Sequence, residues 1–236
     1  MFKVYLSNEI PKEFNEKYAF VVGSDGVYVY RKTNFYESLT KSKKNEIPIL
    51  NKPDQFIYLR NNMNFPMYLM NITYSFFADV YEKYKSEAIV LIYIDNDQKF
   101  YIAPPLQKVS GAHLDYKNNI LHPNNMTLFG TIHSHGTMSA FHSGTDHKDE
   151  EFFDGLHITL GKITSNPPDI SISLVIDGFR GIIKEPERVI EKYGTYQKVP
   201  YPKEWMDQVK YNAPRQISTP THYQIPNHFY DSWRWW

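Results

Sequence analysis

The first sixty residues hold hydrophobic runs typical of β-strands, separated by turn and polar residues. Two β-prone runs, Tyr18–Val22 and Val27–Lys32, flank the turn cluster Gly23–Gly26. Branched and aromatic residues on both sides of a short glycine-containing turn are typical of a β-hairpin. The stretch Thr40–Lys52 then turns polar, with four lysines and a proline, which favours a linker or long loop. We therefore expect a small β-rich unit over residues 1–60.

The pattern changes to that of a helix between Pro66 and Lys85. Hydrophobic residues recur there mostly at spacings of three and four, and Pro66 can occupy the first turn. The aliphatic run Ala88–Asp95 predicts a buried strand, followed by a turn at Asn96 and Asp97. Further strands are expected at Lys99–Ala103, Thr127–His135, Leu156–Leu160, Ser171–Ile176 and Gly178–Lys184, and further helices at Asp146–Phe153 and Glu185–Tyr193. Strands interleaved with two or three helices indicate an α+β or mixed α/β domain over residues 61–192.

Residues 193–236 differ in composition from the rest of the chain. They hold eleven aromatic residues, including all four tryptophans, and five prolines. Proline at that density disfavours a helix or a central strand. One interpretation is an extended arm whose aromatic side chains pack on the main domain. The other is a docking segment for a protein partner, with candidate anchors at Trp233, Trp235 and Trp236.

Charge and cysteine content narrow the classes of function. Lys plus Arg and Asp plus Glu number 26 each, so the formal net charge is zero. Without a basic excess to neutralise phosphates, nucleic-acid binding is disfavoured. The absence of cysteine excludes disulfides, thiolate metal sites and a cysteine nucleophile. Any metal must be held by nitrogen and oxygen ligands, which nine histidines and 26 acidic residues can supply.

Targeting signals are not apparent in the sequence. The first residues lack the apolar core of a secretory signal peptide. The aliphatic run Ala88–Ile94 is far shorter than the roughly 18 apolar residues needed to span a bilayer. We therefore expect a cytoplasmic protein with no membrane partner.

The segment Thr131–Glu150 concentrates side chains that are suited to metal chemistry. His133 and His135 share one face if they lie on a strand, because residues two apart point the same way. Two imidazoles on one face can chelate a metal ion, and Asp146 in the following loop can supply a third ligand. Two histidines and one carboxylate leave zinc an open position for water, as in catalytic rather than structural sites. Zinc lowers the pKa of such a water towards about 7.

Simpler explanations account for the same residues. A His-x-His pair is often incidental, and a lone Glu87 would usually be a surface carboxylate. Ser143 and Asp146 also fit a helix start of the capping-box type, with Ser143 as the N-cap. Both interpretations are compatible, because a helix start can fix the position of a ligand. Three neighbouring histidines are interpreted as surface or supporting residues, or else as partners of Asp146 or of a substrate: His142, His147 and His157.

The complete string H-x-H-x7-S-x2-D resembles the JAMM motif of the JAB/MPN+ zinc metalloproteases. Its fixed positions here are His133, His135, Ser143 and Asp146. That family also has a glutamate between its first helix and first core strand, and Glu87 occupies the corresponding place. The hydrophobic segment Gly155–Gly161 resembles the next core strand of the family. The resemblance covers about Pro66 to Tyr193 and implies a JAB/MPN-like core, a curved mixed sheet flanked by helices, with the N-terminal unit and the aromatic tail outside it.

The resemblance also implies a role for each matching residue. His133, His135 and Asp146 would bind one zinc ion per chain. Glu87 would hold the zinc-bound water, take its proton and pass it to the departing amine. Ser143 would donate a hydrogen bond to the oxyanion of the tetrahedral intermediate. No covalent intermediate is needed, so the lack of cysteine is no obstacle. Many family members have proline after the second histidine, where this chain has glycine.

The implied function is hydrolysis of an isopeptide or peptide bond at the C-terminal tail of a ubiquitin-like protein. Such a tail would bind as an extended strand beside the site. Two other classes stay open. The first is a non-catalytic MPN scaffold for protein interaction, in which Glu87→Gln would have no effect. The second is a DNA-associated protein resembling RadC, which the neutral charge disfavours and salt-dependent DNA binding would support.

Overall fold

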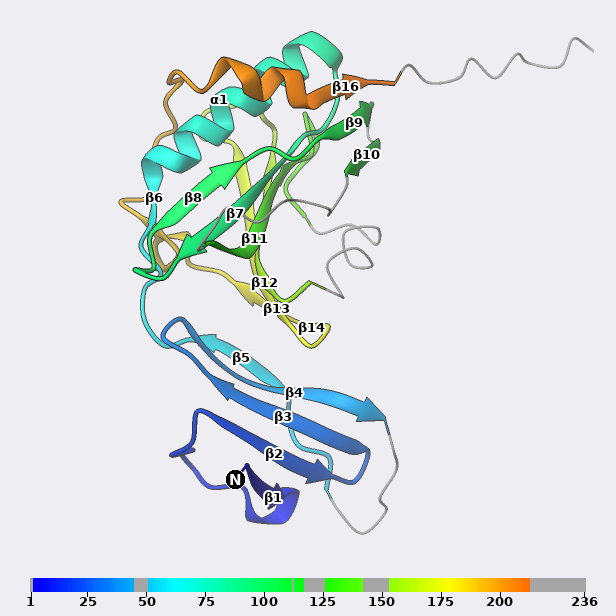
Figure 1. The fold of residues 1–236 in the computed structure, drawn as a ribbon, viewed down its shortest axis with the longest axis vertical. Helices are drawn as coiled ribbons and strands as arrows, with labels where there is room; N and C mark the ends of the chain where they lie inside the picture. The colour runs from blue at the N-terminus through cyan, green and yellow to red at the C-terminus, as the bar shows by residue number, and fades with distance from the viewer. Residues whose placement is uncertain (1, 45–50, 112, 117–125, 142–152, 213–236) are drawn as a thin grey trace, which may run out of the picture.

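The computed structural model describes residues 2–44, 51–111, 113–116, 126–141 and 153–212. An N-terminal sheet forms one end of the molecule (Figure 1). A second, larger sheet forms the other end, and a helix covers one of its faces. Sheets with mixed strand directions and few helices place the chain in the mixed α+β class.

The N-terminal sheet has five strands in sequence order: β1 (Lys3–Leu6), β2 (Tyr18–Gly23), β3 (Gly26–Lys32), β4 (Tyr36–Lys44) and β5 (Phe56–Leu59). A 3-10 turn, η1 (Ser7–Glu9), follows β1. The expected hairpin is confirmed, since β2 and β3 are antiparallel and Gly23 lies opposite Gly26.

The expectation of a loop from Thr40 is wrong for residues 40–44, which continue β4. The polar sequence misled because part of this strand faces the larger domain. Thr40 is fully buried, and its hydroxyl donates to the Asp177 carboxylate over 2.8 Å. Residues 45–50 of the expected loop lie outside the described residues.

The larger sheet has six strands in the order β14-β13-β12-β11-β7-β8. Their bounds are β7 (Ile89–Asp95), β8 (Phe100–Ala103), β11 (Met126–Ser134), β12 (Gly155–Gly161), β13 (Asp169–Ile176) and β14 (Phe179–Ile183). Only β11 and β12 run parallel to each other. All six strands were expected from the hydrophobic pattern, and their observed ends differ from the expected ones by at most two residues.

Helix α1 (Met67–Tyr84) covers the apolar face of this sheet. Pro66 precedes it as the N-cap. The helix ends at Lys85, whose N–H donates to the Tyr81 carbonyl over 2.9 Å and whose left-handed backbone (φ 51°) turns the chain out of the helix. The helix packs Phe77 and other apolar side chains into the same core as Ile132. Within the described part of the chain, no helix is long and apolar enough to cross a membrane.

The expected helix at Glu185–Tyr193 is wrong. A 3-10 turn, η2 (Pro186–Arg188), is followed by strand β15 (Ile190–Glu191), which pairs in parallel with β6 (Phe65–Pro66). The backbone carbonyls of Arg188 and Val189 accept from the N–H groups of Met63 and Phe65, over 2.9 and 2.8 Å, so this segment bonds to the chain before α1 instead of closing helical turns. Of the other expected helix, Asp146–Phe153, only Phe153 lies in the described residues.

The described part of the tail packs on the main domain, as the first of the two interpretations expected. Trp205 is buried in η3 (Lys203–Gln208), and β16 (Val209–Tyr211) joins β9 (Gln107–Ser110) and β10 (His113–Tyr116) in a three-stranded sheet. Residues 213–236, including the last three tryptophans, lie outside the described residues.

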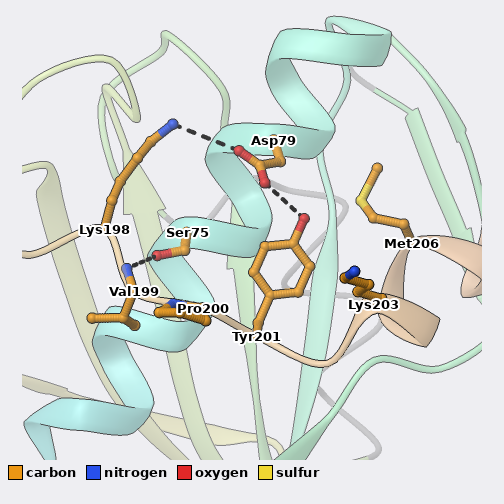
Figure 2. Close-up of a pocket in the computed structure, with 8 residues that line it drawn as sticks. All are labelled: Ser75, Asp79, Lys198, Val199, Pro200, Tyr201, Lys203 and Met206. Atoms are coloured by element: carbon orange, nitrogen blue, oxygen red, sulfur yellow. Dashed lines mark hydrogen bonds and ion pairs between the residues drawn. The ribbon is translucent and has the colours of Figure 1, made fainter.

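Figure 2 shows how the arm is fastened to α1 beside a groove of about 530 Å³. The Tyr201 hydroxyl donates to the Asp79 carboxylate over 2.8 Å, and Lys198 lies 3.6 Å from the same carboxylate. The backbone N–H of Val199 donates to the Ser75 hydroxyl over 2.8 Å. The polar contacts drawn in Figure 2 therefore join residues 198–201 to α1.

The two sheets are joined by an ion-pair cluster around Arg31 on β3. Its guanidinium contacts the carboxylates of Asp154 and Asp177, each over 2.8 Å. The backbone N–H of Asp177 also donates to Asp154 over 2.8 Å. Asp154 immediately precedes β12, so the N-terminal sheet fixes the point at which the chain enters that strand.

Candidate metal centre

Two histidines converge at the end of β11. His133 and His135 are 6% and 4% exposed, and their Nε2 atoms lie 3.2 Å apart. Two nitrogens bound tetrahedrally to one zinc, each about 2.0–2.1 Å from it, are about 3.3 Å apart. The observed separation is that of a hydrogen bond between the two rings, and it also agrees with the spacing of two ligands of one zinc ion, so this pair of residues fits such a group.

The neighbouring strands hold the pair in place. His133 lies opposite Ile89 on β7 and opposite Thr159 on β12. The Thr159 hydroxyl lies 3.4 Å from the His133 Nε2 atom. The backbone N–H of His135 donates to the Leu160 carbonyl over 2.8 Å, which continues the pairing with β12 past the end of β11. Both imidazoles are thus carried by a strand with partners on each side.

The chain leaves the site through a turn that needs glycine. Gly136 has φ 55°, a left-handed backbone that the proline ring, fixed near −65°, cannot adopt. A side chain there would also meet the Tyr81 ring at 2.8 Å. Gly136, which stands where many JAMM proteases have proline, therefore suits the backbone of this turn. Further on, the Phe141 ring packs edge-on against His135 with centroids 4.8 Å apart.

Glu87 lies between α1 and β7, where the sequence places it. The β7–β11 register pairs Ile89 with His133, and the Ser134 N–H donates to the Ala88 carbonyl over 2.9 Å. Continuing that register by two residues puts Glu87 level with His135. Directly opposed residues of antiparallel strands share a face. The half-buried Glu87 therefore lies at a position on the histidine face of the sheet.

Two predicted site residues, Ser143 and Asp146, lie outside the described residues, as do His142 and His147. Among the residues that are described, no group of three or more potential metal ligands is present. Asp146, the predicted third ligand, is not among the described residues. The structure therefore brings together the two histidines and the backbone position of Glu87.

His157 is not a surface residue: it is fully buried. Its Nε2 lies 2.9 Å from the Phe153 carbonyl, which can only accept, so Nε2 carries the proton. Its Nδ1 then accepts from the Thr131 hydroxyl, also over 2.9 Å. With both ring nitrogens engaged, His157 supports the site without being free to bind a metal. It holds Phe153, the first described residue after the segment that carries Ser143 and Asp146.

The polar residues around the site follow a pattern that is visible in the sequence. Along β11 and β12, polar residues alternate with Ile132 and Ile158, and they are Thr131, His133, His157 and Thr159. Alternation places all four on one face of the sheet, opposite the face that α1 covers. A buried polar row on one face of an otherwise apolar sheet indicates where a site lies.

Comparison with known proteins does not assign this chain to a family. A scan against protein-family models matches none of them, and a search of curated proteins finds no similar sequence.

Proposed function

We propose that this chain is a zinc-dependent metallopeptidase of the JAB/MPN type. Its reaction would be hydrolysis of an isopeptide or peptide bond at the C-terminal tail of a ubiquitin-like protein. The observation that carries the proposal is the 3.2 Å separation of the His133 and His135 Nε2 atoms at a buried strand end. The order α1, Glu87, β7, β11, β12 around this pair supports a JAB/MPN-like core.

Each residue has a task in this reaction. Zinc held by His133, His135 and Asp146 would supply Lewis acidity and a water that is acidic near neutral pH. Glu87 takes a proton from the attacking water and returns it to the leaving amine. Ser143 donates a hydrogen bond to the oxyanion as it forms. The carbon–nitrogen bond breaks, and the products are a carboxylate and an amine.

The substrate is expected to bind in extended form. A flexible glycine-containing tail can pair with a strand edge through its backbone, which gives affinity with little dependence on side chains. The low exposure of the two histidines limits access to a thin segment of this sort.

The test is cleavage of a panel of ubiquitin-like proteins, each fused through its C-terminal glycine to a reporter domain. Glu87→Gln should abolish turnover and keep the metal, whereas His133→Ala should lose both. The matched control is Glu82→Gln, an exposed carboxylate of α1 close to Glu87 in sequence, which should keep both.

Contrary results point to specific errors. If zinc binds and no fusion is cut, the substrate class is wrong, and a non-catalytic scaffold becomes the better account. If Glu87→Gln is as metal-free as His133→Ala, then Glu87 is a ligand rather than the base. Salt-dependent binding of DNA by the wild type would instead support the RadC-like alternative.

A further inference from the structure

The short segment between α1 and β7 is held by hydrogen bonds at every residue from 86 to 89. The Gly111 carbonyl accepts from the Ser86 hydroxyl over 2.8 Å and from the Glu87 N–H over 3.2 Å. The Ala88 N–H donates to the Ser134 hydroxyl over 3.0 Å. Because Ser134 lies between the two histidines, this contact ties the Glu87 segment directly to the metal-binding strand.

The last part of this clamp is the side chain of Gln107 on β9. Gln107 is fully buried. Its Oε1 accepts from the Ile89 N–H over 2.9 Å, and its Nε2 donates to the Ile89 carbonyl over 3.0 Å. A primary amide offers a donor and an acceptor side by side, as a peptide group does. Gln107 therefore pairs with β7 as a neighbouring strand would, at the point where β7 begins.

We propose that Gln107 is a positioning residue for Glu87. Ile89 is two residues from Glu87 on the same face, so the amide pair fixes the direction in which the strand leaves Glu87. Displacing a catalytic group by about 1 Å can reduce the rate by about 100-fold, and a backbone held on both sides prevents such a shift. The inference rests on the proposed function, because it gives Glu87 a catalytic task.

The test uses the full chain with Gln107→Met, which keeps the volume and removes both hydrogen bonds to Ile89, together with the longer one from Nε2 to the Pro105 carbonyl at 3.4 Å. Val109→Ala is the matched control, because Val109 is fully buried on the same strand and its side chain makes no such pair. Amide hydrogen exchange at Ile89 reports the clamp without any activity. Cobalt(II) titration, followed by its visible spectrum, reports the metal site.

Gln107→Met should expose the Ile89 amide to exchange beyond any change in global stability. Its cobalt affinity should stay within about twofold of wild type, because His133 lies on β11 and His135 directly after it, rather than on β7. With a fusion that the wild type cuts, kcat should fall about 100-fold at unchanged KM. Val109→Ala should lose stability but keep Ile89 protection and kcat. Should Gln107→Met fail to fold, Gln107→Glu keeps the shape and one acceptor, and it should show a smaller loss of the same kind.

Three results would overturn the inference, and they differ in whether the proposed function fails as well. Wild-type kcat in a folded Gln107→Met variant refutes positioning and leaves the peptidase proposal intact. A loss of cobalt affinity that accounts for the loss of rate assigns Gln107 to the architecture of the metal site instead. A wild type that binds metal and cuts no fusion overturns both the proposed function and this role of Gln107.

Discussion

Gly161, the last residue of β12, is the position at which one added methyl group tests the site loop most directly. A Cβ built there would lie 2.5 Å from the Met138 carbonyl oxygen and nearer still to the backbone of Ser139 and Ala140. Ordinary Cβ contacts begin near 3.4 Å. Gly161→Ala must therefore move the loop after His135 by roughly 1 Å, since the clashing atoms are backbone and cannot rotate away.

That loop has little freedom to give way. The Met138 N–H donates to the His135 carbonyl over 2.9 Å, and the Met138 carbonyl accepts from the Lys162 N–H over 2.6 Å. Overpacking of this kind costs about 1–3 kcal/mol of unfolding free energy. A shift of about 1 Å next to His135 should also reduce turnover by about 100-fold.

The assay compares Gly161→Ala with Gly194→Ala by urea unfolding, metal content and turnover. Gly194 is the matched control because, among the described residues, a Cβ there meets only the Lys192 carbonyl oxygen, at 3.8 Å. An unstrained Gly→Ala change should stabilise by about 0.4–1 kcal/mol and leave turnover unchanged. If Gly161→Ala is as stable and as active as the control, then the loop geometry around the site is not as constrained as the contacts indicate.

Three further predictions concern stability. The buried hydroxyl of Tyr196 has no hydrogen-bond partner among the described residues, so Tyr196→Phe should raise the unfolding free energy by about 1 kcal/mol. A lower unfolding free energy of Tyr196→Phe, measured in urea, would mean that the hydroxyl has a hydrogen-bond partner. Burial also raises the pKa of Tyr196 above its ordinary value of 10. Above pH 10 the unfolded chain releases the tyrosine proton, whereas the folded state keeps it. The part of the unfolding free energy that depends on this proton is therefore fully present below pH 10 and is lost as the pH rises further. Unfolding measured at increasing pH should show a shallower alkaline decline in Tyr196→Phe than in wild type, and equal slopes would refute the assignment. Arg31→Met leaves Asp154 and Asp177 without this cation, so the unfolding free energy should fall by about 1 kcal/mol, because solvent screens these partly exposed pairs. No change, at low salt as well as high, would mean that the ion pairs contribute nothing to joining the sheets.

Hydrophobic periodicity predicted the elements that bury one or both faces in a regular pattern. The periodic segment at Met67–Tyr84 forms a helix that shares a core with the strand formed by the aliphatic run at Ile89–Asp95. The same rule failed where burial came from a distant part of the chain. Thr40 has the polarity of a loop residue, and only its contact with Asp177 across the sheet interface explains its place in β4.

The candidate site was predictable only in part. The spacing of His133 and His135 predicted a shared face, and the structure has their Nε2 atoms converging. Nothing in the sequence indicated that Gln107 would pair with the backbone of Ile89, eighteen residues away. Such side-chain-to-backbone pairs depend on how whole strands meet, which local patterns do not encode. The roles of Ser143 and Asp146 stay predictions, because both lie outside the described residues.

The central claim is that His133 and His135 form a zinc site, and metal content tests it most directly. The full chain, purified without added zinc, should contain about one zinc per chain by elemental analysis. His133→Ala should contain almost none. A wild-type chain that holds no zinc, even after reconstitution with excess metal, would contradict the claim and leave the pair of imidazoles as a structural contact within the sheet.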